Sequence, residues 1–345
     1  MTKRANRRLY IVVSALALVA AACGGNAGGS SGSGAGASIT ISGSSTVEPI
    51  SGANAEKYAS VNPNVQMSVD GPGTGDGFEL FCNGDTDISD ASRPIDPEEE
   101  VPACEKNGVE FIELKVAVDG ITVLTSPEND EVECLSFQDL YALLGPEAEG
   151  FDDWSDANAL GKKVGGSGDY PDAPLEVTAP GEESGTFDSF AELVLEGISV
   201  EQGISEDGPF VRPDYQASAD DNVIIQGVAE NPTSLGWVGY AFFAENTETV
   251  KALQIEAEEG AGCVEPTFET ISEGEYPIAR DLYIYVNAAK AEQKPALADY
   301  VDFYLSDDGL TTVSEVGYVD LPQDAIEETR SVWAERLTGS REVDG

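Results

Sequence analysis

The sequence contains no histidine among its 345 residues, and it is poor in basic residues. The absence of histidine excludes Ser-His-Asp and Cys-His catalysis and the commonest zinc sites. No Ser-x-x-Lys motif occurs either, so a serine hydrolase with a lysine base lacks its usual signature. Only 18 Lys and Arg residues stand against 64 Asp and Glu residues, which gives a formal net charge of -46. This excess of negative charge argues against nucleic acids and anionic lipids as partners.

The N-terminal segment has the pattern of an export signal. Basic residues between Lys3 and Arg8 precede the apolar run Leu9–Ala22, which is too short to span a membrane. We predict a lipoprotein signal peptide over residues 1–22, with Cys23 lipidated as the new N-terminus; the alternative is a simple cleaved secretory signal. Residues 23–37 are rich in Gly and Ser, which predicts a flexible tether. The chain is therefore expected on the outer face of the plasma membrane, held only by the lipid on Cys23, or in a periplasm.

Apart from Cys23, four cysteines remain, an even number that favours disulfides in an exported protein. Four cysteines allow three connectivities. We predict the pairs Cys82 with Cys104 and Cys134 with Cys263, because the first pair falls within one continuous segment and the second can brace another lobe.

Short apolar runs alternate with helix-like segments in the rest of the chain. Examples are SITISG, a helix from about Val47 to Ser60, and then NVQMSVDG. This β-α-β rhythm predicts an α/β fold with parallel strands covered by helices. In SLGWVGYA, Trp237 and Tyr240 are expected to alternate as strand residues do.

The length and order of these elements predict two lobes. We assign residues 38–122 together with 284–345 to lobe I, and residues 123–283 to lobe II. The chain then crosses between the lobes near Ile121–Thr125 and near Arg280–Tyr285. Two crossings permit hinge closure around a ligand.

Four loops share small residues, hydroxyls and a helix expected just after them. Their candidate residues are Ser44, Ser45, Thr46 and Val47 in GSSTVEP, Thr74 and Gly75 in GPGTGDGF, Ser92 and Arg93 in DISDASRPI, and Ser184, Gly185 and Thr186 in GEESGTFDSF. Free N–H groups at helix starts, hydroxyls and close backbone approach at glycine together suit an oxyanion. The simpler interpretation of each single loop is an ordinary N-cap or turn.

As a set, these segments resemble a known family. SGSSTVEPI, GTGDGFELFCNGDTDISDASRPI, SGTFDSF and DDNVIIQGVAENPTSLGWVGYAFFAEN are similar, in this order, to the phosphate-binding proteins of phosphate ABC importers, particularly the cyanobacterial and actinobacterial branch. The resemblance implies a two-lobed periplasmic-binding-protein fold of type II. It also implies that inorganic phosphate is bound between the lobes and delivered to ABC transporter permease subunits. Ser45, Thr46, Val47, Thr74 and the Ser184–Thr186 triplet match the family's phosphate donors.

Two positions depart from the family pattern. Many members have an Arg four residues before the serine of the triplet, where this chain has Pro180, and some have an Asp where this chain has Arg93. In the family arrangement that Asp accepts the proton of monohydrogen phosphate and repels sulfate. The candidates to replace it here are Asp90, Asp220 and Asp221, and the sequence does not choose among them.

Alternative functions are the binding of sulfate, molybdate or tungstate, a secreted phosphatase, or a surface adhesin or sensor. A phosphatase without histidine would need a carboxylate site for Ca²⁺ or Mg²⁺. The leading interpretation is a monomeric binding protein that performs no catalysis and needs no cofactor or metal.

Overall fold

The computed structural model describes residues 37–182, 184–204, 208–257 and 260–341, within the compact unit Gly36–Gly345. The predicted signal peptide, the predicted lipidation site Cys23 and all but the last residue of the predicted tether lie outside the described residues. None of the helices formed by the described residues is long and apolar enough to cross a membrane.

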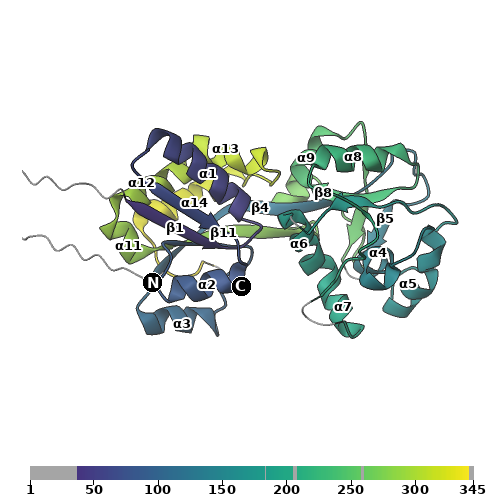
Figure 1. The fold of residues 1–345 in the computed structure, drawn as a ribbon, viewed down its shortest axis with the longest axis horizontal. Helices are drawn as coiled ribbons and strands as arrows, with labels where there is room; N and C mark the ends of the chain where they lie inside the picture. The colour runs from purple at the N-terminus through teal and green to yellow at the C-terminus, as the bar shows by residue number, and fades with distance from the viewer. Residues whose placement is uncertain (1–36, 183, 205–207, 258–259, 342–345) are drawn as a thin grey trace, which may run out of the picture. The chain divides into compact units, whose positions relative to one another are not determined.

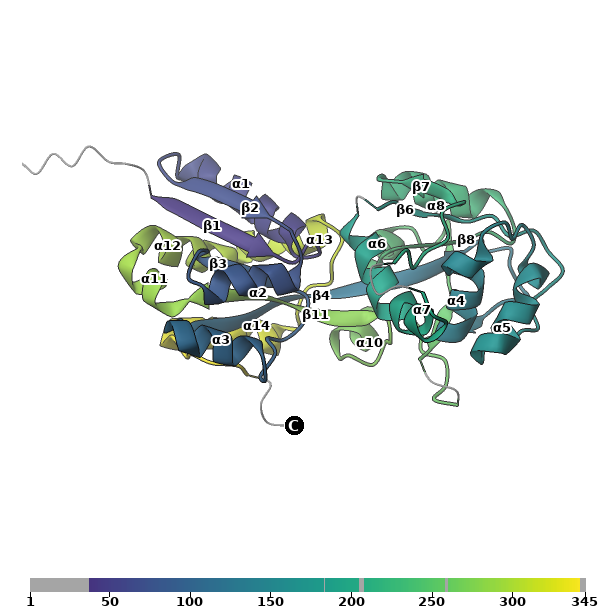
Figure 2. The ribbon, with the colours of Figure 1, turned by 60° about the horizontal axis from the view of Figure 1, so that its bottom comes forward.

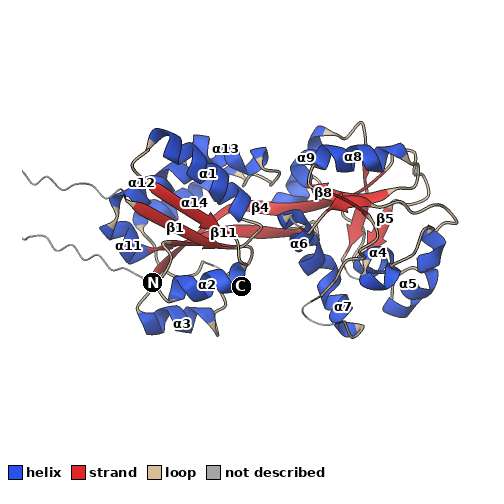
Figure 3. Ribbon diagram, in the orientation of Figure 1, coloured by secondary structure: helices blue, strands red, loops and turns tan. Residues whose placement is uncertain are grey.

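The main sheet, whose strands are drawn in red in Figure 3, has the strand order β2-β1-β3-β11-β4-β8. The bounds are β1 Ser38–Gly43, β2 Gln66–Asp70, β3 Ile88–Ala91, β4 Phe111–Thr125, β8 Leu235–Gly239 and β11 Ala279–Asn287. Strand β1 runs parallel to β2 and β3, as the β-α-β rhythm predicts. Strand β11 is antiparallel to both β3 and β4, and the far end of β4 pairs with β8 and with β9, Lys251–Ala252.

Lobe I, the part built around β1–β3, has helices on both faces of this sheet (Figures 1 and 2). Its helices are α1 Glu48–Val61, α2 Thr74–Cys82, α3 Glu100–Asn107, α11 Ala288–Gln293, α12 Pro295–Tyr304, α13 Asp307–Glu315 and α14 Gln323–Glu335. Alternate residues of β11 enter different cores, because successive strand side chains point to opposite faces. Leu282, Ile284 and Val286 join the core under α1, α12 and α14, whereas Tyr283 and Tyr285 pack against α2.

Lobe II contains the remaining elements. They are β5 Cys134–Ser136, α4 Phe137–Leu144, α5 Asn158–Val164, β6 Thr178–Pro180, α6 Gly185–Phe190, α7 Gly197–Glu201, β7 Gln216–Ser218, α8 Asp221–Glu230, α9 Tyr240–Glu245, β10 Gln254–Glu256, α10 Phe268–Ser272, and the short 3-10 helices η1 Pro146–Ala148 and η2 Trp154–Ala157. The π-helical segment Ala191–Glu196 joins α6 to α7 without a break. The rod so formed is anchored by Phe190, which stacks on Trp237 with ring centroids 4.4 Å apart.

Strands β4 and β11 are the two connections that pass between the lobes (Figure 1). The core that β4 enters changes along its length: residues up to Ala117 pack in lobe I, and those from Val118 pack in lobe II. The predicted lobe boundaries fall inside these two continuous strands, so we keep them as a proposal. Bending of this strand pair would move one core relative to the other.

Two further expectations have a clear outcome. The disulfides Cys82–Cys104 and Cys134–Cys263 are present, which confirms the predicted pairing. The expectation for Tyr240 is wrong: β8 ends at Gly239, and Tyr240 is the first residue of α9. A Cβ at position 239 would lie only 2.7 Å from the Gly317 carbonyl oxygen. The strand therefore ends at a glycine where the backbone passes close to a neighbouring segment.

Candidate functional site

The turn between β1 and α1 is held by contacts to β3 and within itself. The Ser44 amide donates to the Asp90 carbonyl at 2.9 Å, and the Val47 amide donates to the Ser44 carbonyl at 3.2 Å. Ser44 Oγ accepts a hydrogen bond from the Thr46 amide at 3.2 Å. Ser44 and Val47 are buried and shape the turn, whereas the side chains of Ser45 and Thr46 reach other parts of the chain.

The glycine loop packs directly on this turn. The Gly73 amide donates to the Gly43 carbonyl at 2.9 Å. A Cβ on Gly71 would lie 2.9 Å from Ser45 Cα, and one on Gly43, where φ is +154°, would lie 2.0 Å from the Asp90 carbonyl oxygen. Glycines are required at these positions because the backbones touch.

The second and third loops meet through Thr74 and Ser92. Thr74 Oγ1 accepts a hydrogen bond from the Ser92 amide at 3.2 Å and lies 3.0 Å from Ser92 Oγ. Gly75 follows in the first turn of α2, where amides lack intrahelical partners. Three of the four predicted loops are therefore neighbours within lobe I.

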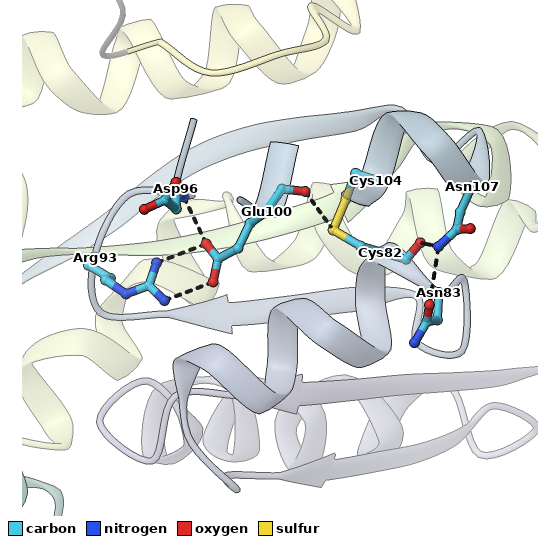
Figure 4. The surroundings of a disulfide bond; sticks show 7 residues. All are labelled: Cys82, Asn83, Arg93, Asp96, Glu100, Cys104 and Asn107. Carbon is cyan, nitrogen blue, oxygen red and sulfur yellow. Dashed lines mark hydrogen bonds and ion pairs between the residues drawn. A yellow bond between two sulfur atoms is a disulfide. The ribbon is translucent and has the colours of Figure 1, made fainter. Parts of the chain in front are cut away.

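Arg93 is directed to a carboxylate of its own lobe (Figure 4). Its Nη1 and Nη2 donate to the two oxygens of Glu100 at 2.9 and 2.8 Å. The guanidinium carbon lies 5.5 Å from the centre of the Phe78 ring. The hydrogen bonds that Arg93 donates to Glu100 raise the pKa of Arg93. Contact between Arg93 and an anion stays a prediction, and it would compete with this bidentate pair.

The fourth loop, at the start of α6 in lobe II, lies against the first loop of lobe I. Ser184 Oγ accepts from the Thr186 amide at 3.2 Å and so caps α6. A Cβ on Gly185 would lie 3.1 Å from the Ser45 carbonyl oxygen and 3.2 Å from Thr46 Cα. One turn later, Thr46 Oγ1 lies 3.1 Å from Ser189 Oγ. The Ser-Gly-Thr triplet and the Ser-Ser-Thr turn therefore face each other.

Arg280 of β11 joins these two loops, and no motif in the sequence pointed to it. Its Nη2 donates to Thr46 Oγ1 at 3.1 Å and to Ser189 Oγ at 2.8 Å. Its Nη1 donates to Glu192 Oε2 at 2.6 Å. The Arg280 side chain is only 10% exposed. It is thus a nearly buried guanidinium bonded to one hydroxyl from each lobe.

Asp119 of β4 is the register partner of Arg280 across the two connecting strands. Its Oδ2 lies 3.7 Å from Arg280 Nε, and the Asp119 side chain is 2% exposed. Within the described part of the chain, neither Asp119 Oδ2 nor Arg280 Nε has a hydrogen-bond partner. Burial raises the pKa of Asp119, and the charge of Arg280 opposes this rise. A buried acceptor and a buried donor are therefore left open side by side.

The three carboxylates suggested by the sequence have different surroundings. Asp90 is fully buried, and its Oδ1 accepts from Ser51 Oγ at 2.9 Å; burial raises its pKa to about 7. Asp220 caps α8 by accepting from the Asn222 amide at 2.9 Å. Burial raises the pKa of Asp221 to about 6. Among the described residues, Arg280 forms ion pairs with Asp119 and Glu192, and of these two carboxylates Asp119 is the buried one.

The arrangement offers hydroxyl, amide and guanidinium donors from both lobes, with one buried carboxylate among them. Charge-assisted hydrogen bonds from such donors suit an oxyanion, and a carboxylate can accept a proton that the oxyanion carries. Two further acidic groups at the site are bonded to proposed donors: Asp188 to Ser45 and Glu192 to Arg280.

Comparison with known proteins gives a consistent result. The model of a PBP superfamily domain matches residues 28–308. The protein SphX of Synechocystis sp. is 39% identical over 290 residues, covering 84% of this chain and 80% of the relative. The phosphate-binding protein PstS of Staphylococcus aureus is 34% identical over 308 residues, covering 89% of this chain and 85% of the relative. A solved structure of a possible phosphate binding protein from Planctomyces limnophilus is 36% identical with a TM-score of 0.77, covering 88% of this chain and 100% of that chain.

Proposed function

Because the chain belongs to the PBP superfamily, and within it to the family of the SphX and PstS proteins, we propose that it binds inorganic phosphate between its two lobes and delivers it to an ABC importer. The support is twofold. Relatives that match most of the chain include a phosphate-binding protein, and the two lobes bring suitable donors together at one point.

The proposal rests mainly on the position of Arg280. Its guanidinium is bonded to Thr46 of lobe I and Ser189 of lobe II, so an anion bound there would be held by both lobes at once. A guanidinium presents several N–H groups in a fixed plane, which matches the oxygens of phosphate. Hinge closure through β4 and β11 would then be favoured by the ligand itself.

The proposed phosphate donors combine the predicted loops with the guanidinium that the fold supplies. They are the side chains or amides of Ser45, Thr46, Val47, Thr74, Gly75, Ser184, Gly185, Thr186, Ser189 and Arg280. Each bond to a charged group contributes about 1.5–3 kcal/mol, so the convergent set outweighs the repulsion of a distant acidic surface. That repulsion is screened over about 10 Å at 0.1 M salt.

Asp119 is the proposed acceptor for the proton of monohydrogen phosphate. Its open oxygen stands 3.7 Å from the open Nε of Arg280, so an oxyanion that accepts from Nε can donate its own proton to Asp119. Sulfate carries no such proton and would face the carboxylate with lone pairs only. Affinity for phosphate should therefore depend on pH in a way that affinity for sulfate does not.

Export, the lipid on Cys23, the monomeric state and the contact with permease subunits complete the proposal. They rest on the N-terminal pattern and on the family resemblance. The protein acts as a binding protein without catalysis, so p-nitrophenyl phosphate should stay intact in its presence, with or without added Mg²⁺ or Ca²⁺.

Calorimetric titration tests the proposal. Phosphate should bind the wild-type protein, and both Arg280→Lys and Asp119→Asn should bind it more weakly, with Asp119→Asn also losing discrimination against sulfate. Arg330→Lys is the matched control, because Arg330 pairs with Asp307 on lobe I. A wild-type protein that binds sulfate, molybdate or tungstate but not phosphate would refute the proposed ligand.

A further inference from the structure

Two carboxylates of lobe II already occupy donors of the proposed phosphate site. Asp188 Oδ2 accepts from Ser45 Oγ at 3.0 Å, and Glu192 Oε2 accepts from Arg280 Nη1 at 2.6 Å. Asp188 and Glu192 stand four positions apart on the rod formed by α6 and the π-helical segment, so they leave the same side of it. The chain thus presents two of its own oxygens where an external oxyanion would bind.

We infer that Asp188 and Glu192 are specificity-determining residues that compete with the anion for Ser45 and Arg280, so that only a multiply charged oxyanion displaces them. This inference rests on the proposed function. An anion cannot share these donors with two charged carboxylates, because like charges at hydrogen-bond distance repel strongly. Binding therefore requires both side chains to leave. The apparent association constant is then the intrinsic constant multiplied by the fraction of molecules in which both have left.

The surroundings allow this displacement. The Glu192 side chain is 52% exposed, so it can return to water at little cost. A groove of about 450 Å³ adjoins the pair and is lined in part by Phe187, Asp188, Glu192 and Phe210. Partial burial raises the pKa of Asp188, and the charge of Glu192 adds to this rise. Thr46 and Ser189, in contrast, are buried and keep their positions.

The competition discriminates by charge and shape. A monoanion such as chloride has one charge and no directional array of acceptors, so it replaces two carboxylates poorly. A tetrahedral dianion can accept from Ser45, Thr46 and Arg280 together, which compensates for the bonds lost by Asp188 and Glu192. The acidic pair therefore keeps abundant monoanions out of the site.

The test is calorimetric titration of Glu192→Ala, Asp188→Ala and the double variant with inorganic phosphate. Each single substitution should tighten binding about tenfold, which corresponds to about 1.4 kcal/mol. Glu201→Ala is the control for charge alone, because Glu201 is an exposed residue of the same rod; its affinity should match the wild type. If an alanine variant has a lowered melting temperature, Asp188→Asn and Glu192→Gln replace it, because they remove the charge with less change in side-chain shape.

A second arm replaces sodium gluconate by sodium chloride at equal ionic strength. Chloride should weaken phosphate binding to the double variant at least about fivefold, which corresponds to about 1 kcal/mol. Phosphate binding to the wild type should not change. Unchanged or weaker phosphate binding in both single variants would overturn the inference while leaving the proposed function intact. Absence of phosphate binding in the wild type and in every variant would instead refute the proposed function, and the inference with it.

Discussion

Removal of Arg280 should destabilise the protein in a pH-dependent way, because Asp119 would be left buried without its cation. The two side chains are 10% and 2% exposed, and their charged atoms approach to 3.7 Å. Breaking a buried pair by removing one partner costs about 3–5 kcal/mol. Loss of the contact to Glu192 adds at most about 1 kcal/mol, because Glu192 is 52% exposed. Arg280→Gln should therefore lower the free energy of unfolding at pH 8 by about 3–6 kcal/mol.

The sign of the pH effect follows from the raised pKa of Asp119, which burial causes and Arg280 opposes. A carboxyl whose pKa is higher in the folded state destabilises the fold as pH rises from its unfolded value, about 3.9, through its folded value. Without Arg280 the folded pKa rises further, so the loss should be smaller at pH 5 than at pH 8. The double variant Asp119→Asn with Arg280→Gln should recover most of the loss at pH 8.

Denaturant unfolding of the wild type, both single variants and the double variant at the two pH values gives the required free energies. An equal loss for Arg280→Gln at pH 5 and pH 8, or a double variant no more stable than Arg280→Gln, would refute the assignment of Asp119 as the buried partner.

Three further outcomes are expected. Thr74→Val should weaken phosphate binding by about 1–3 kcal/mol in a calorimetric titration, because it removes a hydroxyl from the site and leaves the Ser92 amide unpaired; unchanged affinity would remove Thr74 from the site. Gly185→Ala should weaken binding by about 1–3 kcal/mol, since the new methyl group would press on Ser45 and Thr46; Gly197→Ala, which has no neighbour within 4 Å, should bind as the wild type does. Added salt should speed phosphate association in stopped-flow measurements, because the net charge of -46 repels a dianion; rates that fall with salt would contradict this.

The loops and the elements around them were accessible from the sequence because their signals are local. Hydroxyls before helix starts and glycines in tight turns identify the Ser44–Val47, Gly71–Gly75 and Ser184–Thr186 loops. The alternation of apolar runs and helix patterns gave the α/β class. The disulfide pairing was predicted because Cys82 and Cys104 fall within one continuous segment and Cys134 and Cys263 can brace another lobe, and the structure confirms both bonds.

Arg280 and Asp119 were not found in this way because their pairing depends on strand register. Each stands in a strand that also carries other charged residues, and the two strands lie far apart in the sequence. A signal was nevertheless present: Arg280 stands in one predicted crossing, and Asp119 stands two residues before the other, Ile121–Thr125. For Arg93 the sequence suggested contact with an anion but did not indicate the carboxylate that the side chain pairs with. That partner, Glu100, is the first residue of α3, and no motif indicates such a local pair.

A crystal structure with phosphate tests the central claim most directly. We predict phosphate between the Ser45–Val47 turn and the Ser184–Thr186 triplet, within hydrogen-bond distance of Arg280 and Asp119, with Asp188 and Glu192 turned away. Phosphate bound elsewhere in the chain, with Arg280 still bonded to Thr46, Ser189 and Glu192, would contradict the account.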